Sequence, residues 1–523
     1  MGQVNRRAVL LGGAAAVSAA ALSSTVPSWA NARTLAAAPA IRDPFQLGVA
    51  SGDPLPDSVV LWTRLAPAPL NPDGFGGMPD ASYTVDWEIA NDQAFSSVVQ
   101  NGTATAARAS GHSVHIEPAG LEAGREYFYR FKTGGYISPV GRTRTAPAAG
   151  AAVNQLKYCF SSCQHWEEGW YHSYKGMLAD NPELVLFLGD YMYEKKSGRA
   201  AAERNPRHLA FTEDVTTLAQ YRARHAQHKT DADLQNAHAM APWIVVFDDH
   251  EVMNNWNGTT SPATADRKAA GFQAFYENMP IRSTAKPSGS TIRLYRQFGW
   301  GNLARFHMLD TRQYRNAQVP DPSGSAGPSC TDMRSTSRSI LGTAQEAWLL
   351  KALETQPAKW DFLGQQVFFA TRDGDGNKAT CESPDSWQGY EASRDRIAKG
   401  IVDRKVPNPI VLTGDVHRHW AADLRRDYFN HSDPVFGSEL VTTSVTSNSD
   451  TATDPSSAWL SNNPHIKYCR GKRGYVRVTA SQTQMRADFM TVSDTTEYDF
   501  SKVTLAADRS YVVEAGKPGL QKA

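Results

Sequence analysis

The chain has 523 residues, of which 41% are hydrophobic and 20% are charged. This composition is that of a globular protein with a large core, and it excludes wholesale disorder. The formal net charge of +1 excludes a chain-wide electrostatic attraction to nucleic acid or anionic membranes, although a local basic patch is left open. At about 150 residues per domain, the length predicts roughly two to four domains.

The first residues have the pattern of an export signal. Arg6 and Arg7 precede a run rich in Ala and Gly, and Ala30 and Ala32 frame a cleavage site. We predict a twin-arginine signal peptide over residues 1–32, recognised by the twin-arginine export machinery, and an extracytoplasmic location. A disordered or membrane-anchoring N-terminus is the alternative. The Ala- and Gly-rich run is too short and too weakly apolar for a stable span, and no later stretch reaches about 18 apolar residues without charge, so we expect no stable membrane insertion.

The cysteines fit an exported protein with at least one free thiol. There are five of them, an odd number, so not all can pair. Cys330 and Cys381 lie in loops rich in Ser, Gly and Pro and are candidates for a disulfide. The sequence leaves the connectivity of Cys159 and Cys469 open as well, while Cys163 has a different predicted role, described below.

Residues 43–147 predict an all-β domain. Apolar and polar residues alternate over 58–64, 83–89 and 127–131, and turns rich in Gly, Asp and Pro separate these runs. About seven short strands in about 100 residues are typical of an immunoglobulin-like sandwich. The segment contains no cysteine, so an antibody-style disulfide is excluded.

A small-residue linker at 146–152 precedes a change of pattern. From residue 153 to 523, buried strand-like runs end in polar residues and alternate with helical patterns, which predicts an α/β domain. Helices are expected at about 215–241 and at 343–354, the second opening with a capping box formed by Thr343 and Glu346. The strand-like runs that matter most are 184–188, 243–247, 303–309 and 410–413.

Four strand ends carry residues of the types that bind metals, and strand ends are where open α/β sheets place their sites. Each motif alone has an ordinary explanation, such as a Gly-Asp turn, a helix cap or a structural histidine. Together they would leave buried carboxylates without compensating cations, which is costly, so bound metal is the better explanation. The motifs contain Cys163; Asp190 and Tyr193; Asp248, Asp249 and His250 with Asn254 and Asn255; and Asp415, His417 and His419.

The ligand types indicate which metals to expect. A thiolate and a phenolate suit a trivalent ion such as Fe³⁺, whereas aspartate oxygens suit Ca²⁺, with Zn²⁺ or Mn²⁺ as the alternative at that second site. Asp190 precedes Tyr193 by three residues, so one loop offers both. Asp190 is then placed to bridge two metals about 3.5–4 Å apart, an arrangement used in phosphoester hydrolysis.

These motifs resemble those of the PhoD-type alkaline phosphatases, which are related to the calcineurin-like and purple acid metallophosphoesterases. The resemblance covers nearly the whole mature chain and includes residues 45–54, 309–315 and 341–349. It implies an N-terminal β-sandwich, a catalytic α/β domain built as a calcineurin-like β-sandwich flanked by helices, twin-arginine export and an iron–calcium centre.

The resemblance also implies ligand roles. Asp248 and Asp249 compete for one role, and we assign it to Asp249. For calcium the implied ligands are Asp249 and Asp415, with Asn255, or its neighbour Asn254, as an addition. For iron they are Cys163, Asp190, Tyr193 and His417, with Asp190 bridging.

Three further side chains are each assigned a role and an alternative. His250 is expected to protonate the leaving group, or else to serve as a hydrogen-bonded neighbour of an aspartate. Arg312 is expected to hold phosphate, with an ion pair to a structural aspartate as the alternative. His419 is either a neighbour of the metal ligands or an unrelated imidazole.

The sequence therefore predicts a secreted alkaline phosphatase that hydrolyses phosphate monoesters with a metal-activated hydroxide. A phosphodiesterase acting on phospholipids, teichoic acids or nucleic acids would use the same site and is the first alternative. A non-enzymatic extracellular binding protein is the remote one. Serine-nucleophile hydrolysis is disfavoured because no G-x-S-x-G elbow is found. The expected partner is a phosphoester substrate, and no sequence-specific nucleic acid is expected.

Overall fold

The computed structural model describes residues 39–198, 211–258, 263–319, 330–355, 357–374, 383–448 and 457–523. The predicted signal peptide therefore lies outside the described residues. Cys381 and the side chain of Cys330 lie outside them too, so the pairing of these two cysteines stays a prediction. Cys159 and Cys163 are both buried free thiols.

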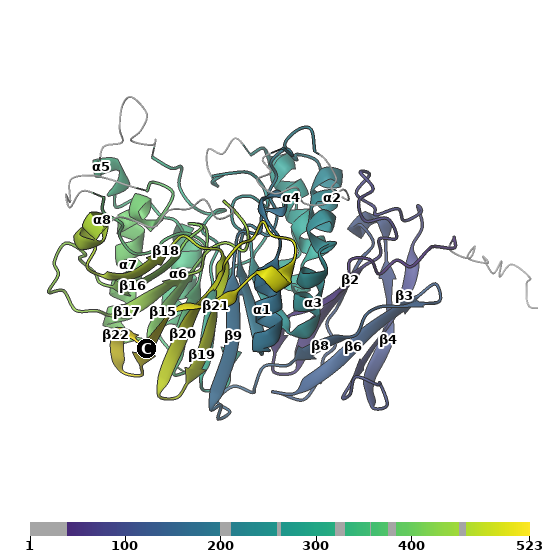
Figure 1. Cartoon of the computed structure of the whole chain (residues 1–523), viewed down its shortest axis with the longest axis horizontal. Coiled ribbons are helices and arrows are strands. Elements are labelled where there is room, and N and C mark those ends of the chain that lie inside the picture. The colour runs from purple at the N-terminus through teal and green to yellow at the C-terminus, as the bar shows by residue number, and fades with distance from the viewer. Residues whose placement is uncertain are drawn as a thin grey trace, which may run out of the picture. The chain divides into compact units, whose positions relative to one another are not determined.

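Strands from both ends of the chain build the first sheet (Figure 1). Its middle strands β9, β10 and β11 are parallel, so their carboxyl ends all lie at the same end of the sheet. Within the described residues the sheet has ten strands, in the order β22 (Lys517–Lys522), β21 (Leu505–Glu514), β20 (Gln484–Val492), β19 (Gly474–Ser481), β9 (Gln155–Ser161), β10 (Leu184–Leu188), β11 (Pro242–Val246), β1 (Val49–Leu55), β2 (Ser58–Arg64) and β5 (Ser113–Ile116).

A second sheet packs face to face against the first. The ring of Tyr158 on β9 contacts Phe306 and Phe362 of the second sheet, with ring centroids 5.4 Å apart in both pairs. The described part of this sheet has seven strands, in the order β12 (Arg296–Trp300), β13 (Ala304–Met308), β14 (Trp360–Gly364), β15 (Pro409–Thr413), β17 (Gly437–Val441), β16 (His419–Leu424) and β18 (Ile466–Arg470).

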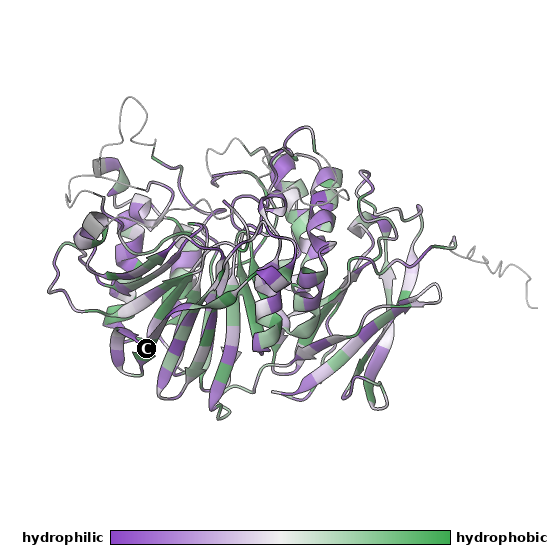
Figure 2. Ribbon diagram, viewed as in Figure 1, coloured by the Kyte–Doolittle hydropathy of each residue, from purple (hydrophilic) through white to green (hydrophobic). Residues whose placement is uncertain are grey.

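Helices flank the two sheets. In Figure 1 helices α1 to α4 gather beside the first sheet, and α6 and α7 lie beside the second. Figure 2 shows hydrophobic residues running through the central strands and longer polar stretches on the helices, as expected for a core between the sheets. The helices are α1 (His172–Asp180), α2 (Leu218–Lys229), α3 (Ala232–Met240), α4 (Ala265–Asn278), α5 (Cys330–Met333), α6 (Gly342–Ala352), α7 (Glu391–Asp403) and α8 (Ser457–Asn462).

The N-terminal strands belong to two sheets. Strands β1, β2 and β5 extend the first sheet, because β1 pairs in parallel with β11. The others form a separate sheet of β3 (Tyr83–Ala90), β4 (Val98–Ala106), β6 (Glu126–Thr133), β7 (Tyr136–Ile137) and β8 (Gly141–Arg144). Side chains of both groups, such as Leu61 and Phe131, share one core cluster. Residues Pro39–Ala523 form one compact unit, and an independent sandwich over residues 43–147 stays a prediction.

The helix expected over residues 215–241 is wrong as a single element. Two helices, α2 and α3, occupy this stretch. Asp231 adopts an extended backbone between them, and its side chain accepts a hydrogen bond from the Leu234 N–H at 3.0 Å. An aspartate used as an N-cap begins a new helix instead of continuing the old one.

The capping box predicted at Thr343 is also wrong. Helix α6 begins at Gly342, and its N-cap Leu341 makes no side-chain capping bond. The Glu346 carboxylate instead accepts a bond from Arg396 at 3.0 Å and one from Ser393 at 3.1 Å. A tertiary ion pair with α7 has therefore replaced the local cap.

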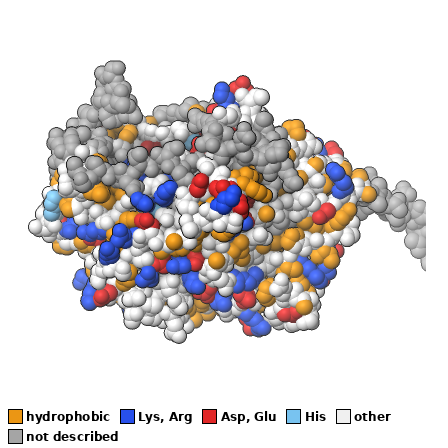
Figure 3. All heavy atoms as spheres, in the orientation of Figure 1, with side chains coloured by type: hydrophobic (Ala, Val, Ile, Leu, Met, Phe, Trp, Pro, Cys, Tyr) orange, Lys and Arg blue, Asp and Glu red, His pale blue; other side chains and the backbone are white. Residues whose placement is uncertain are grey.

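Two surface properties bear on partners. Among the described residues, no helix combines the length and the apolar character needed to cross a membrane. On the face drawn in Figure 3, basic and acidic side chains are interspersed, in keeping with the formal net charge of +1.

Buried histidine provides a prediction about acid stability. His225 on α2 is fully buried, and both of its ring nitrogens lack a partner among the described residues. Burial, together with the charges of Lys229 and Arg64, lowers the pKa of His225 to about 3. As the pH falls below about 6.5, the unfolded chain takes up this proton before the folded chain does. The free energy of unfolding therefore decreases between pH 6.5 and pH 3, by about 1.4 kcal/mol for each pH unit.

We expect His225→Leu to remove this contribution. Between pH 6.5 and 4.5 the free energy of unfolding of the variant should fall by about 2–3 kcal/mol less than that of the wild type. Urea unfolding at the two pH values measures the difference. Equal pH dependence in the two proteins would show that His225 does not stay neutral in the fold.

Candidate metal centre

The loops after four strands meet at one end of the two sheets. Cys163, Asp190, Asp248 and Asp415 each lie two residues beyond the end of a strand, namely β9, β10, β11 and β15. The Cys163 N–H donates to the Gly189 carbonyl at 3.0 Å, which ties the first two loops together. An isolated bridge between residues 162 and 444 joins the two sheets at the same end. The strand ends thus converge as the sequence predicted.

The backbone of these loops is strained where the side chains converge. Cys163, Asp190, Asp415 and His417 all have left-handed backbones, with φ between 52° and 61°. Each such conformation costs an L-residue roughly 1 kcal/mol or more, and such strain clusters at functional sites. Four strained residues in one place indicate that the fold holds these side chains in position at a cost to stability.

Glycine at position 189 allows two of the loops to approach closely. A Cβ atom on Gly189 would lie 2.4 Å from the Cβ of Asp248, and the residue itself has φ +101°. Any other residue would push the second loop away from the third. The Gly-Asp pair, which alone looks like an ordinary turn, is here a steric requirement of the site.

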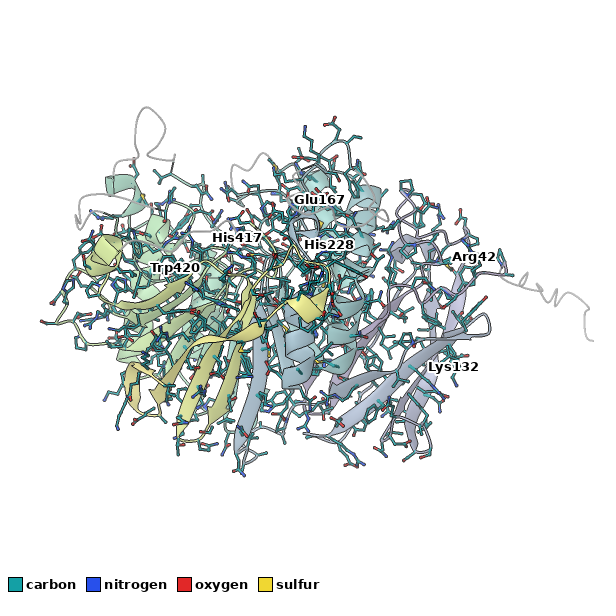
Figure 4. All side chains as sticks on the ribbon, viewed as in Figure 1. Arg42, Lys132, Glu167, His228, His417 and Trp420 are labelled. Atoms are coloured by element: carbon teal, nitrogen blue, oxygen red, sulfur yellow. The ribbon has the colours of Figure 1, made fainter. Side chains whose placement is uncertain are left out.

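The first cluster contains sulfur, oxygen and nitrogen donors. Cys163, Asp190 and His417 each offer one ligand atom, and these atoms lie within 4.8 Å of one another. The Tyr193 hydroxyl lies 2.9 Å from Asp190 Oδ2 and 3.3 Å from His417 Nε2, so all four predicted iron ligands meet here. Figure 4 labels His417 at the loop ends; Trp420, three residues on, belongs to strand β16. Ser447, which the sequence analysis did not identify, lies 2.6 Å from the tyrosine hydroxyl.

The second cluster contains only carboxylates. Asp248, Asp249 and Asp415 offer oxygens within 4.8 Å of one another, and Asp190 joins Asp249 and His250 in a third such group. Asp190 therefore lies between the two clusters, as expected for a bridging ligand. The Asn255 side chain is exposed, and its backbone N–H donates to Asp249 Oδ2 at 2.6 Å. A ligand role for Asn255 or Asn254 stays a prediction.

Burial raises the pKa values of several of these anions. The pKa of Asp190 and that of Asp415 are both raised well above the ordinary value, and that of Asp248 is raised to about 6. Burial also raises the pKa of the Asp249 carboxyl, but the charges of Arg312 and His250 outweigh it and hold this pKa below its usual range. Three carboxylates thus lack enough positive charge around them to ionise easily. A bound cation would reverse these shifts.

Arg312 is enclosed by aspartates. Its guanidinium is fully buried, and Nε bonds to Asp248. Nη1 and Nη2 bind the two oxygens of Asp385 at 2.8 and 3.2 Å, and Nη2 lies 3.4 Å from Asp415 Oδ1. This is the ion-pair arrangement that we gave as the alternative for Arg312. Direct contact with phosphate stays a prediction, and Asp385 is a site residue that the sequence analysis missed.

His250 is bound by a buried glutamate. Its Nδ1 lies 2.6 Å from Oε2 of Glu194, whose side chain is fully buried. Burial lowers the pKa of His250, but the charges of Asp249, Asp190 and Glu194 outweigh it and raise this pKa well above the ordinary value. These three carboxylates therefore favour the protonated form of the imidazole. The sequence signal for Glu194 was its position directly after Tyr193.

His419 has a structural role. It is buried on β16, where Nε2 lies 3.1 Å from the Met490 carbonyl and Nδ1 accepts the Thr443 N–H at 3.2 Å. Both ring nitrogens thus bind the backbone, and neither is available to the clusters.

Replacing the glutamate should change the titration of the histidine. In Glu194→Gln the imidazolium loses one of its three nearby anions, so we expect the pKa of His250 to fall by about one unit or more. Histidine-selective NMR titration of the metal-free protein measures this value. His465, whose pKa burial lowers to about 4, is the internal control and should not move. An unchanged pKa of His250 in this variant would show that Glu194 does not stabilise the protonated imidazole.

Two family models match this chain. A model of the PhoD-like phosphatases matches residues 158–489, and a model of their N-terminal domain matches residues 29–147. The chain belongs to the PhoD-like phosphatase family. This confirms the predicted membership of a phosphatase enzyme family.

Individual relatives agree with this assignment. Alkaline phosphatase D of Bacillus subtilis (strain 168) is 43% identical over 519 residues, which cover 98% of this chain and 88% of that protein. A solved structure of PhoD is 42% identical, covers 93% of both chains and has a TM-score of 0.86.

A more distant structure supports the fold alone. The purple acid phosphatase from yellow lupin (Lupinus luteus) seeds is 13% identical, covers 89% of this chain and 73% of its own, and has a TM-score of 0.56. The chain therefore shares its overall fold with this purple acid phosphatase.

Proposed function

We propose that this phosphatase hydrolyses phosphate monoesters at a two-metal site and releases inorganic phosphate. The observation that carries the proposal is the pair of ligand clusters with Asp190 between them, since Asp190 belongs to the first cluster and also groups with Asp249 of the second. Family membership supports the reaction class, and this position of one carboxylate supports two metals held close together.

The first cluster fits a trivalent ion. Cys163, Asp190 and Tyr193 supply three anions when deprotonated, and His417 supplies a neutral imidazole. Burial raises the pKa of both the Cys163 thiol and the Tyr193 hydroxyl well above their usual values, so only a strong Lewis acid would hold them as anions. We assign this cluster to Fe³⁺.

The second cluster fits a divalent ion that prefers oxygen. Four carboxylates and the two guanidinium groups of Arg312 and Arg315 meet here, a net charge of −2 when all are ionised. We assign the cluster to Ca²⁺, held by Asp249 and Asp415 and, in addition, by Asn255; Zn²⁺ or Mn²⁺ is the alternative.

When bound, the two cations would hold phosphate oxygens and lower the pKa of a water molecule, which supplies the attacking hydroxide. The protein's own groups do the rest. His250, with Nδ1 bound to Glu194, has Nε2 left to donate a proton to the leaving oxygen. Arg312 adds a fixed positive charge beside the aspartates, where we propose that it also faces the phosphoryl oxygens.

We also propose that the protein works outside the cytoplasm. The paired arginines, the Ala-rich run and the cleavage site within residues 1–32 support export by the twin-arginine route. That route carries folded proteins, which suits a chain that acquires its metals before export. With it we propose the division into an N-terminal β-sandwich over residues 43–147 and a catalytic domain over residues 153–523.

Removing the thiol ligand should remove the iron. In Cys163→Ala we expect loss of iron and a fall of more than about hundredfold in turnover of p-nitrophenyl phosphate. Elemental analysis and a visible spectrum of the folded protein measure the metal. Cys159→Ala is the matched control, since Cys159 is an equally buried thiol outside the clusters, and it should keep both iron and activity. Cys163→Ala with full iron and full turnover would refute the assignment.

A wild type that prefers bis-nitrophenyl phosphate to p-nitrophenyl phosphate would favour the phosphodiesterase alternative.

The proposed acid role of His250 depends on the leaving group. Alkyl phosphates need a proton on the leaving oxygen, whereas p-nitrophenolate leaves without one. We therefore expect His250→Ala to slow alkyl monoesters by about hundredfold or more and nitrophenyl esters far less. Steady-state rates on both substrates, with iron content unchanged, test this. Equal losses on the two substrates would argue against proton donation by His250.

A further inference from the structure

Asp385 is the hub of an ion-pair network at the edge of the carboxylate cluster. It lies in the loop that follows residue 383, just before a short helical turn at Trp387–Tyr390. Its Oδ1 accepts bonds from Arg312 Nη1 at 2.8 Å, from Arg315 Nη2 at 2.6 Å, and from Gln318. Its Oδ2 accepts Arg312 Nη2 at 3.2 Å. None of the metal-binding groups described above includes Asp385.

The position of Arg312 matters because an arginine competes with a metal. Its guanidinium is a cation surrounded by the same carboxylates that a divalent ion would need. The close contacts of Arg312 are to Asp248 and Asp385, on two different edges of the planar group. Its Nη2 stays 3.4 Å from Asp415 Oδ1 and 3.8 Å from Asp249 Oδ1. The two aspartates assigned to calcium are thus the ones that Arg312 binds least closely.

Among the described residues, the hydrogen bonds of Arg315 all go to Asp385. Arg315 is fully buried, and its Nη1 donates to the Asp385 main-chain carbonyl at 3.2 Å while Nη2 binds the carboxylate. A guanidinium that binds both the main-chain carbonyl and the carboxylate of one residue restrains the backbone and the side chain of that residue together. Arg315 therefore fixes Asp385, and Asp385 in turn fixes Arg312.

We propose that Asp385 and Arg315 are positioning residues that draw Arg312 away from Asp249 and Asp415 and so leave these two carboxylates to a divalent cation. The inference rests on the proposed calcium site and adds what sets its affinity. Without the bonds from Arg315 to Asp385 and from Asp385 to Arg312, the Arg312 side chain moves towards Asp249 and Asp415 and forms ion pairs with them. Calcium then has to displace the guanidinium in order to bind.

A pure charge effect and a positioning role predict different calcium affinities for variants of Arg315, so the two can be told apart. Replacing Arg315 by glutamine removes a positive charge near the site, so a pure charge effect would tighten cation binding. Loss of positioning would weaken it instead. Arg315→Lys keeps the positive charge but loses the two-pronged guanidinium that binds Asp385. If only charge matters, the calcium affinity of this variant stays unchanged. If positioning matters, its calcium affinity is weaker.

The experiment is a calcium titration by isothermal calorimetry. It uses the iron-loaded full-length protein after calcium has been removed with a chelator. We expect about tenfold weaker calcium binding in Arg315→Lys and in Arg315→Gln, as for the loss of one charged hydrogen bond, and the same direction in Asp385→Asn. Thermal unfolding of each calcium-free variant verifies that it is folded.

Glu88→Gln is the matched control. The Glu88 side chain is 21% exposed and bound by Arg130 at 2.7 Å and Lys132 at 2.8 Å, much as the Asp385 side chain is 26% exposed and bound by two cations. Glu88 lies on β3, outside the clusters, so calcium affinity should not change. Wild-type affinity or tighter in both Arg315 variants overturns the positioning role alone. A wild type that binds no calcium overturns the proposed calcium site, and the inference with it.

Discussion

Asp190 is a buried carboxylate and Asp415 a partly buried one, and both lie beside further aspartates with too little positive charge around them. Burial raises the pKa of each well above its usual value, and the charges of neighbouring aspartates raise it further. Like charges at this separation can ionise together only if cations join them. The rest of the site follows from this requirement. Arg312 neutralises part of the excess, and the remainder matches the charge of metal ions.

Holding these charges together requires strained backbone conformations in the loops. Four of the ligand candidates have left-handed backbones, and Gly189 is needed because a Cβ there would collide with the neighbouring loop. The left-handed backbones of the four non-glycine residues would be unfavourable in an isolated turn. Two sheets packed face to face hold the strand ends rigidly enough to maintain that strain.

The N-terminal strands take part in this framework. Asp53 on β1 has φ 45° and binds Arg296 of the second sheet, with Nη2 2.7 Å from Oδ1. Its carbonyl also accepts a bond from the guanidinium of Arg282 at 2.9 Å. Because β1 pairs with β11, this segment supports the strand that leads into the loop with Asp248 and Asp249. The N-terminal region is therefore more than an appended module, since it contributes to the sheet that bears the site.

The sequence by itself identified the candidate ligands, their places at strand ends and the family. These are local properties, because an apolar run that ends in Gly-Asp or Asp-Asp-His is visible in a few consecutive residues. Only the tertiary structure decided which side chains meet. Asp385 is 73 residues from Arg312, Glu194 is 56 from His250, and Ser447 is 254 from Tyr193. The same holds for Glu346, whose predicted capping bond gave way to Arg396. Partners that are far apart in the chain leave no pattern in a single sequence, because the energy that selects them arises only after the sheets have packed.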